Sequence, residues 1–109
     1  MVIATLQGEI DISNVAEIGE EIRDAIGNDP VGLCLHLDEV RYVDSAGIRM
    51  VFDLVARLEA CRQRVAIVMS ADAPIRRLIE ITNLGDLVTI HDAVDACVEH
   101  LDGSLEDLL

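Results

Sequence analysis

The feature that most constrains this chain is an alternation of two apolar periodicities. Short β-rich runs alternate with stretches in which apolar residues recur every three or four positions, the spacing of an amphipathic helix. The four β-rich runs lie at residues 2–6, 31–37, 65–69 and 87–90. The four helical stretches begin near Ser13, Asp44, Asp72 and Ala93. Short connections between them predict an α/β domain with a mostly parallel or mixed sheet and right-handed crossovers.

Local signals set the expected ends of these elements. Ser13 or Asp11 is a candidate cap of the first helix, and Asp72 of the third, because short polar side chains accept hydrogen bonds from first-turn amides. We expect the first helix to stop at residues 27–30, which are rich in turn formers. The second β-rich run is expected to end in a turn at residues 38–39.

The composition fits one domain. With 109 residues, 51% of them hydrophobic, the chain can bury a core without metals or disulfides. We expect a single domain over residues 1–101, followed by an acidic C-terminal tail at residues 102–109. No internal repeat or linker divides the chain.

The charge excludes several function classes. The net charge is −13, and all eight basic residues are arginine. The absence of lysine argues against P-loop NTPases, Schiff-base enzymes and phosphoacceptor receiver domains, because each of them needs a lysine amine. The arginines form no basic stripe with interleaved aromatics, and the negative charge would repel a phosphate backbone. We therefore expect no direct binding to nucleic acid.

Cysteine usage and the N-terminus bear on location. Cys34, Cys61 and Cys97 are odd in number and lie in apolar patterns, which predicts buried small hydrophobes in a reducing compartment. The first six residues have no basic start, and no segment approaches the ~18 apolar residues that span a bilayer. We expect a cytoplasmic protein without membrane insertion.

Two strand-to-helix junctions, residues 8–13 and 42–48, hold polar side chains that core packing does not explain. In open α/β sheets, ligands and partners meet such junctions. Ser45 lies at or near a helix N-cap, and Gly47 allows a second backbone to approach. Ser45 either caps the helix, with Asp44 favouring its positive end, or presents a hydroxyl where anions are favoured, which suits a phosphoserine.

Catalysis is not indicated. A serine nucleophile needs a base, and His36, His91 and His100 have no visible relation to Ser45. Metal spacings such as HxxxH or CxxC are missing, so we expect no metal site and no cofactor. The sequence therefore predicts a binding protein and not an enzyme.

Across nearly its whole length the chain resembles the STAS domain of bacterial anti-sigma factor antagonists. The matching motifs, in order, are Gly8-Glu9-Ile10-Asp11, Val43-Asp44-Ser45-Ala46-Gly47-Ile48, Ile75-Arg76-Arg77-Leu78 and Asn83-Leu84-Gly85. The resemblance implies an α/β fold of the STAS type, with a four- or five-stranded mixed sheet and about four helices largely on one face. It places the family's phosphorylated serine at Ser45 and its binding aspartate at Asp11.

The resemblance implies a partner switch. Unphosphorylated, the domain would bind an anti-sigma factor that is also a serine kinase; phosphorylation of Ser45 would end that binding, and a phosphatase would restore it. A phosphate adds about −1.5 to −2 charges at neutral pH, which opposes binding in a desolvated interface. The implied partner-binding surface comprises Asp11, Asp44, Ser45, Ala46, Gly47, Ile48 and Arg49.

Two residues depart from the family pattern. Ala46 stands where many members have a second hydroxyl, so Ser45 is the remaining acceptor, and Arg49 stands where the antagonists commonly have glycine. Because Arg49 follows Ser45 by four residues, we expect both on one helix face, where a phosphate on Ser45 could pair with the guanidinium. An ordinary exposed arginine is the alternative.

Two other functions remain open. The chain can be a stand-alone STAS subunit of an anion or lipid transporter, or of a larger signalling complex, without phospho-switching. The second alternative is a small enzyme or nucleotide-binding domain that uses the cleft near Asp11 and Ser45. The absence of lysine and of a glycine-rich loop argues against it.

Overall fold

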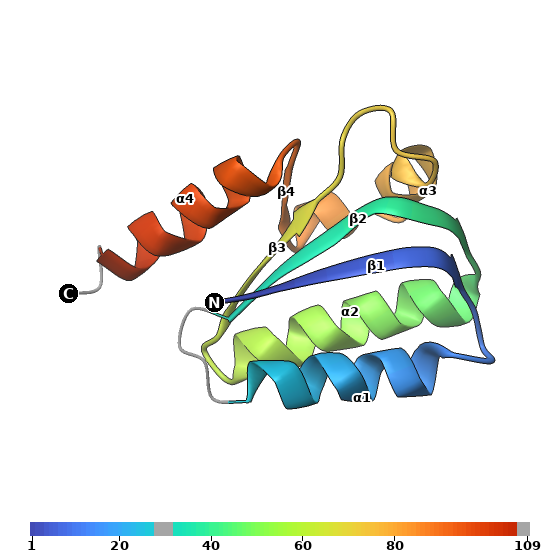
Figure 1. Cartoon of the computed structure of the whole chain (residues 1–109), viewed down its shortest axis with the longest axis horizontal. Helices are drawn as coiled ribbons and strands as arrows, with labels where there is room; N and C mark the ends of the chain where they lie inside the picture. Colours follow the sequence, from blue (N-terminus) through green and yellow to red (C-terminus); the bar gives the residue numbers. More distant parts are fainter. Residues whose placement is uncertain (28–31, 107–109) are drawn as a thin grey trace.

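The computed structural model describes residues 1–27 and 32–106 and shows an α/β fold. The sheet has four strands, and Figure 1 shows helices on both of its faces. In chain order the elements are β1 (Val2–Ile10), α1 (Val15–Ile26), β2 (Gly32–Val43), α2 (Ser45–Ala60), β3 (Arg64–Val68), α3 (Arg76–Ile81), the 3-10 turn η1 (Leu84–Asp86), β4 (Thr89–His91) and α4 (Val94–Glu106). The alternation of strand and helix is confirmed.

The strand order explains where the helices lie. The sheet order is β1-β2-β3-β4, and every described pairing is parallel. The described sheet is therefore parallel, and the antiparallel strand that a mixed sheet would need is not found among the described residues. Right-handed crossovers that always advance in one direction place their helices on the same face. Residues of α1, α2 and α3 accordingly share one core. No described strand follows α4, and this helix packs on the opposite face (Figure 1).

Strand β2 is longer than predicted. The turn expected at residues 38–39 is wrong, because β2 continues to Val43. The register between β1 and β2 shifts twice, between Thr5 and Gln7 and again between Gly8 and Glu9. At each shift β2 has an extra residue, so polar side chains occur within the strand without ending it. These irregularities are invisible to a period-two pattern.

The two faces of the sheet bury two unequal cores. Along β2 the side chains of Leu33 and Leu35 enter the core beneath α1 and α2, whereas Cys34 faces α4, as the alternation of a strand requires. Twenty buried described residues form the first core, here called the main core. The second, here called the α4 core, is formed by Cys34, Ala66, Val68, Cys97 and Leu101. Burial of Cys34 and Cys97 is confirmed, but Cys61 is exposed, against expectation.

Several predicted helix ends are wrong. Helix α1 begins after Asn14, whose side chain makes no capping bond, so neither Ser13 nor Asp11 caps it. Helix α3 begins after Ile75, beyond the predicted cap Asp72, because hydrogen-bonded turns occupy the preceding residues.

Two further predicted boundaries fall where the described residues end. The predicted stop at residues 27–30 coincides with the C-cap at Gly27, and residues 28–30 lie outside the described residues. The helical backbone of α4 continues through Glu106, into the predicted tail, and residues 107–109 lie outside the described residues. The domain boundary after residue 101 stays a prediction.

Candidate functional site

The two polar junctions meet at the carboxyl ends of β1 and β2. The amide of Asp44 donates to the carbonyl of Ile10 at 3.2 Å, which joins the ends of the two strands. One carboxylate oxygen of Asp44 accepts from the Ile12 amide at 3.1 Å, and the other accepts from the Gly47 amide at 2.9 Å. A single side chain therefore holds the loop after β1 against the first turn of α2.

Asp44 is the N-cap of α2, and Ser45 is the first residue inside the helix. The hypothesis that Ser45 caps this helix is therefore wrong. Its hydroxyl is exposed and makes no hydrogen bond within the described part of the chain. The carboxylate already occupies the capping position, which leaves the neighbouring hydroxyl available to another molecule.

Gly47 allows α2 to lie close to the strand ends. A Cβ atom at this position would come 2.4 Å from Cγ2 of Val43 and 3.0 Å from the carbonyl oxygen of Ile10. Both distances are tighter than ordinary van der Waals contact, and the carbonyl belongs to the backbone and cannot rotate away. The glycine in this motif thus serves packing, as the sequence predicted.

The loop after β1 is held by its own polar side chains. The Asp11 carboxylate accepts from the amide of Ser13 at 2.9 Å and also from its hydroxyl. Asn14 accepts from the Asp11 amide at 2.9 Å and donates to the Glu9 carbonyl at 2.8 Å. Asp11 is therefore near the Ser45 junction but is bonded within its own loop. Sequence reasoning missed Asn14, although asparagine beside aspartate is a usual signal of such turns.

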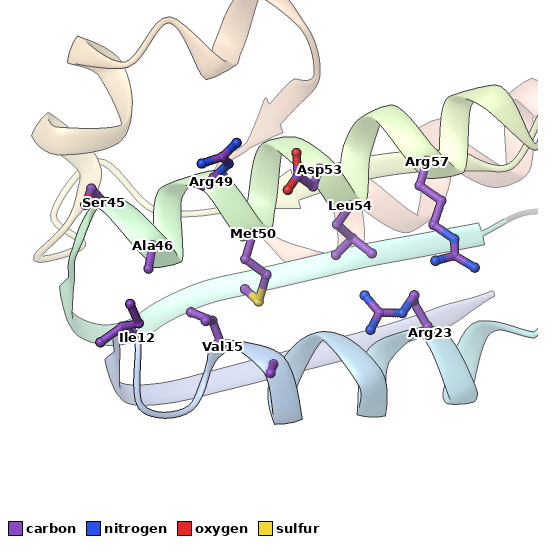
Figure 2. Close-up of a pocket in the computed structure, with 11 residues that line it drawn as sticks. Ile12, Val15, Arg23, Ser45, Ala46, Arg49, Met50, Asp53, Leu54 and Arg57 are labelled. Atoms are coloured by element: carbon purple, nitrogen blue, oxygen red, sulfur yellow. The ribbon is translucent and has the colours of Figure 1, made fainter.

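A groove of about 720 Å³ runs between α1 and α2, with Ser45 at one end. Ile12 borders the same end and is 79% exposed, the largest fraction among the exposed large hydrophobic residues described. Figure 2 shows Arg23 of α1 and Arg57 of α2 extending toward each other at the far end of the groove.

The lining of this groove is positive. Arg23, Arg49 and Arg57 line it together with one acidic residue, Asp53, whereas the whole chain has a net charge of −13. None of the three guanidinium groups forms an ion pair with a described carboxylate. The sequence indicated Arg49, but Arg23 and Arg57 were missed because their proximity depends on how two helices pack.

A second polar cluster fixes the end of β3. Asp38 accepts from the Ser70 amide at 2.6 Å and is 3.0 Å from Nε2 of His36. Burial alone would raise the pKa of Asp38, but the hydrogen bond from Ser70 and the interaction with His36 outweigh it, so this pKa lies below its ordinary value. Arg76 adds a hydrogen bond to the Met69 carbonyl at 2.6 Å. These contacts position the loop between β3 and α3.

Serine or metal catalysis at the candidate site would need a histidine base beside Ser45 or a cluster of metal ligands. No histidine lines the groove beside Ser45. Within residues 1–27 and 32–106, no three histidine, cysteine or acidic side chains gather as metal ligands. No helix in the described part is both long and apolar enough to cross a membrane. The arrangement places on one surface an exposed hydroxyl, an exposed isoleucine side chain and three guanidinium groups that pair with no described carboxylate.

Comparisons with known proteins agree on one fold. The family model of the STAS domain matches residues 1–97. An anti-sigma factor antagonist from Mycobacterium paratuberculosis has 20% identity and a TM-score of 0.79, over 92% of this chain and 84% of that one. The unphosphorylated anti-sigma factor antagonist SpoIIAA has 20% identity and a TM-score of 0.74, over 93% of this chain and 87% of that one.

A transporter family protein shares the fold as well. A sulfate transporter family protein from Wolinella succinogenes has 17% identity and a TM-score of 0.76, over 95% of this chain and 86% of that one. At these identities the likeness establishes the fold alone. None of the curated proteins compared with the chain matches it.

Proposed function

Because the chain belongs to the STAS domain family, we propose that it is a bacterial anti-sigma factor antagonist whose protein binding is controlled by phosphorylation of Ser45. The observation that supports this function best is the exposed Ser45 hydroxyl, which lies one residue beyond the Asp44 cap and bonds to no described residue. Unphosphorylated, the domain sequesters an anti-sigma factor that is also a serine kinase. The domain acts in the cytoplasm in transcription regulation, as a binding module and not an enzyme.

The position of Ser45 suits a phosphoryl acceptor. The partner kinase transfers the γ-phosphoryl group of ATP to the Ser45 oxygen, the hydroxyl proton leaves, and ADP is released. The catalytic groups belong to the kinase. The product phosphate lies at the N-terminus of α2, where the helix dipole favours negative charge, so the fold tolerates it. A phosphatase reverses the modification by hydrolysis.

The same phosphate opposes partner binding. It adds about −1.5 to −2 charges to the end of the groove where Ile12 offers apolar surface to the partner. Desolvating that charge in an interface is costly. Arg49, four residues further along α2, pairs with the phosphate and is thereby withdrawn from the partner. Phosphorylation therefore places negative charge beside Ile12 and makes Arg49 unavailable to the partner in one step.

The groove favours an acidic segment of the partner. Arg23, Arg49 and Arg57 have no carboxylate partners in the described part of the chain, so a partner can neutralise them without displacing an existing ion pair. Charge complementarity of this kind speeds association and selects partners. The proposed partner-binding surface thus keeps the exposed and half-buried members of the predicted set, Asp11 and Asp44 to Arg49 without the buried Gly47, and extends along the groove.

The direct test is phosphorylation by candidate kinases. The full chain is incubated with ATP and an anti-sigma kinase, and the phosphate is located by mass spectrometry. We expect one phosphate, on Ser45, that is lost in Ser45→Ala and kept in Ser13→Ala, which removes a second exposed serine whose hydroxyl is bonded to Asp11. Ser45→Asp should weaken kinase binding at least about tenfold, as expected for a charge introduced into an interface. An unmodified Ser45 together with unchanged binding of Ser45→Asp would refute the switch.

The similarity to a sulfate transporter family protein favours a second candidate, a stand-alone STAS subunit of an anion or lipid transporter or of a larger signalling complex. In that case the same groove contacts a cytoplasmic segment of the membrane protein, and no phosphorylation is needed. Co-purification with a membrane protein, unchanged in Ser45→Asp, would favour this function over the switch.

A further inference from the structure

Two buried thiols face each other across the α4 core. Cys34 lies on β2 and Cys97 on α4, both are 0% exposed, and their sulfur atoms are 2.7 Å apart. No other described polar side chain bonds to either sulfur. The third cysteine, Cys61, is exposed at the C-terminal end of α2. The spacing of 63 residues between the buried pair hides this relation in the sequence.

We propose that Cys34 and Cys97 form an oxidative modification site, in which a two-electron oxidant such as hydrogen peroxide joins them as a disulfide. One thiolate attacks the peroxide, becomes a sulfenic acid and releases water. The second thiol, as its thiolate, then attacks that sulfur, the S–S bond forms, and a second water leaves. The two thiols lose two electrons and two protons in total, and the peroxide is reduced to two waters.

The geometry favours this pair over any other. A disulfide needs sulfurs about 2.05 Å apart, so these two need to approach by roughly 0.6 Å, within the reach of small side-chain rotations. The neighbours that must adjust are the small side chains Ala66 and Val68 together with Leu101. Cys61 lies at the end of α2, outside this cluster, and has no thiol beside it in the described part of the chain.

Burial sets the conditions for oxidation. Desolvation raises the pKa of both thiols. The hydrogen bond and the charge interaction with Cys34 raise the pKa of Cys97 further, whereas the hydrogen bond with Cys97 partly offsets the rise in pKa at Cys34. Since the thiolate is the reactive form, both sulfurs react slowly while α4 is docked. Oxidation should therefore speed up with rising pH and when α4 opens transiently. Exposed Cys61 should react first with alkylating reagents, which allows it to be blocked before the test.

Once formed, the bond fixes α4 to the sheet. It closes a loop that contains most of the chain, and a link over such a loop removes much conformational freedom from the unfolded state. We expect the midpoint of thermal unfolding to rise by at least about 5 °C. Because α2, which begins at Ser45, packs on the opposite face of the sheet from α4 (Figure 1), the bond should leave the groove unchanged.

The test uses the full chain with Cys61→Ser, treated with hydrogen peroxide at pH 8.5. We expect an intact mass lower by two hydrogen atoms, one cross-linked peptide pair containing Cys34 and Cys97, and a higher unfolding midpoint that returns to its original value after reduction. In the same Cys61→Ser background, adding Cys97→Ala should abolish all of these changes. Cys34→Ala replaces Cys97→Ala as the control if the latter fails to fold. Monomers that keep both thiols, or that stop at sulfinic acid on one sulfur, would overturn the proposal. Both results are independent of any effect of Ser45.

Discussion

The two faces of the sheet differ in what holds them. On the face covered by α1, α2 and α3, twenty described residues are buried in the main core. Each of these helices is preceded and followed by a strand along the chain, which holds it on this face. The opposite face buries five, and α4 is attached through them with no described strand following it. The helices that form the candidate site are therefore held by strands at both of their ends as well as by packing, whereas α4 is joined to a described strand at one end and otherwise depends on packing.

The largest expected effect on stability comes from truncating one buried leucine in each core, which compares how much the two cores contribute to the free energy of unfolding. Leu35→Ala opens a cavity in the main core and should lower the free energy of unfolding by about 4 kcal/mol, whereas Leu101→Ala should cost about 2 kcal/mol, near the lower end for buried leucines. Denaturant unfolding measures both values. Hydrogen exchange should show faster exchange throughout the sheet for Leu35→Ala, and chiefly in α4 for Leu101→Ala. Equal losses with equal spread would contradict the distinction between the two cores.

A substitution at Gly47 tests how tightly the site rests on the main core. Gly47→Ala places a Cβ against Val43 and the Ile10 carbonyl, so α2 has to move, and we expect a loss of about 2 kcal/mol in unfolding free energy. The control is Gly85→Ala, whose Cβ would meet only Ile90, at an ordinary 3.7 Å. Thermal unfolding compares the two variants. A tolerated alanine at Gly47 would mean that the close approach of α2 is not required.

Within the site, we expect Asp44 to contribute to stability and Ser45 to contribute to phosphorylation alone. Asp44→Ala removes the cap of α2 and the bond to the Ile12 amide, at an expected cost of about 1–2 kcal/mol. Ser45→Ala removes an unbonded hydroxyl and should stay within about 0.5 kcal/mol of the native protein. Chemical denaturation gives both values, and phosphate incorporation gives the second readout. A large loss in Ser45→Ala would assign the hydroxyl a structural role.

The Asp38 cluster should make the β3–α3 loop sensitive to acid. The folded-state pKa of Asp38 is below its unfolded value, so its stabilisation is fully present above the unfolded pKa of about 3.9, declines below it and is gone once the pH has fallen through the folded-state pKa. Comparing unfolding free energies at pH 7 and pH 3 should show a larger acid-induced loss for the native protein than for Asp38→Asn. Equal losses would show that this carboxylate does not contribute.

The smallest effect on stability is expected in the groove. Replacing both Arg23 and Arg57 with glutamine removes no described ion pair, so the unfolding free energy should change by less than about 0.5 kcal/mol. Affinity for an anti-sigma kinase should fall, and its dependence on salt should weaken. A double variant of two exposed arginines outside the groove, Arg62→Gln with Arg77→Gln, is the control for the loss of two charges. Unchanged affinity in the double variant would remove the far end of the groove from the interface.

The sequence predicted those parts that depend on local pattern. The alternation of periods specified the strand-helix order, and the residues around Ser45 marked the junction that the structure places at the strand ends. The extra residues of β2 were missed because a bulge depends on the partner strand. Asp44 and Ser45 both have oxygens suited to capping, and only the backbone geometry distinguishes them.

Contacts between distant segments could not be predicted from one sequence. Arg23 and Arg57 lie at one end of the groove because α1 and α2 pack side by side (Figure 2). Cys34 and Cys97 meet because α4 turns to the opposite face from the other helices. Exposure of Cys61 was also missed, because the apolar residues around it belong to the end of α2 and not to a strand or helix interior.

The placement of α4 has a consequence for how such a chain can change over evolutionary time. Helices α1, α2 and α3 each connect two strands, so an insertion or a shift in any of them displaces the sheet itself. Substitutions in α4 need to satisfy only the few side chains beneath it. This helix is therefore where sequence drift, or an engineered fusion, should be tolerated best without altering the surface around Ser45.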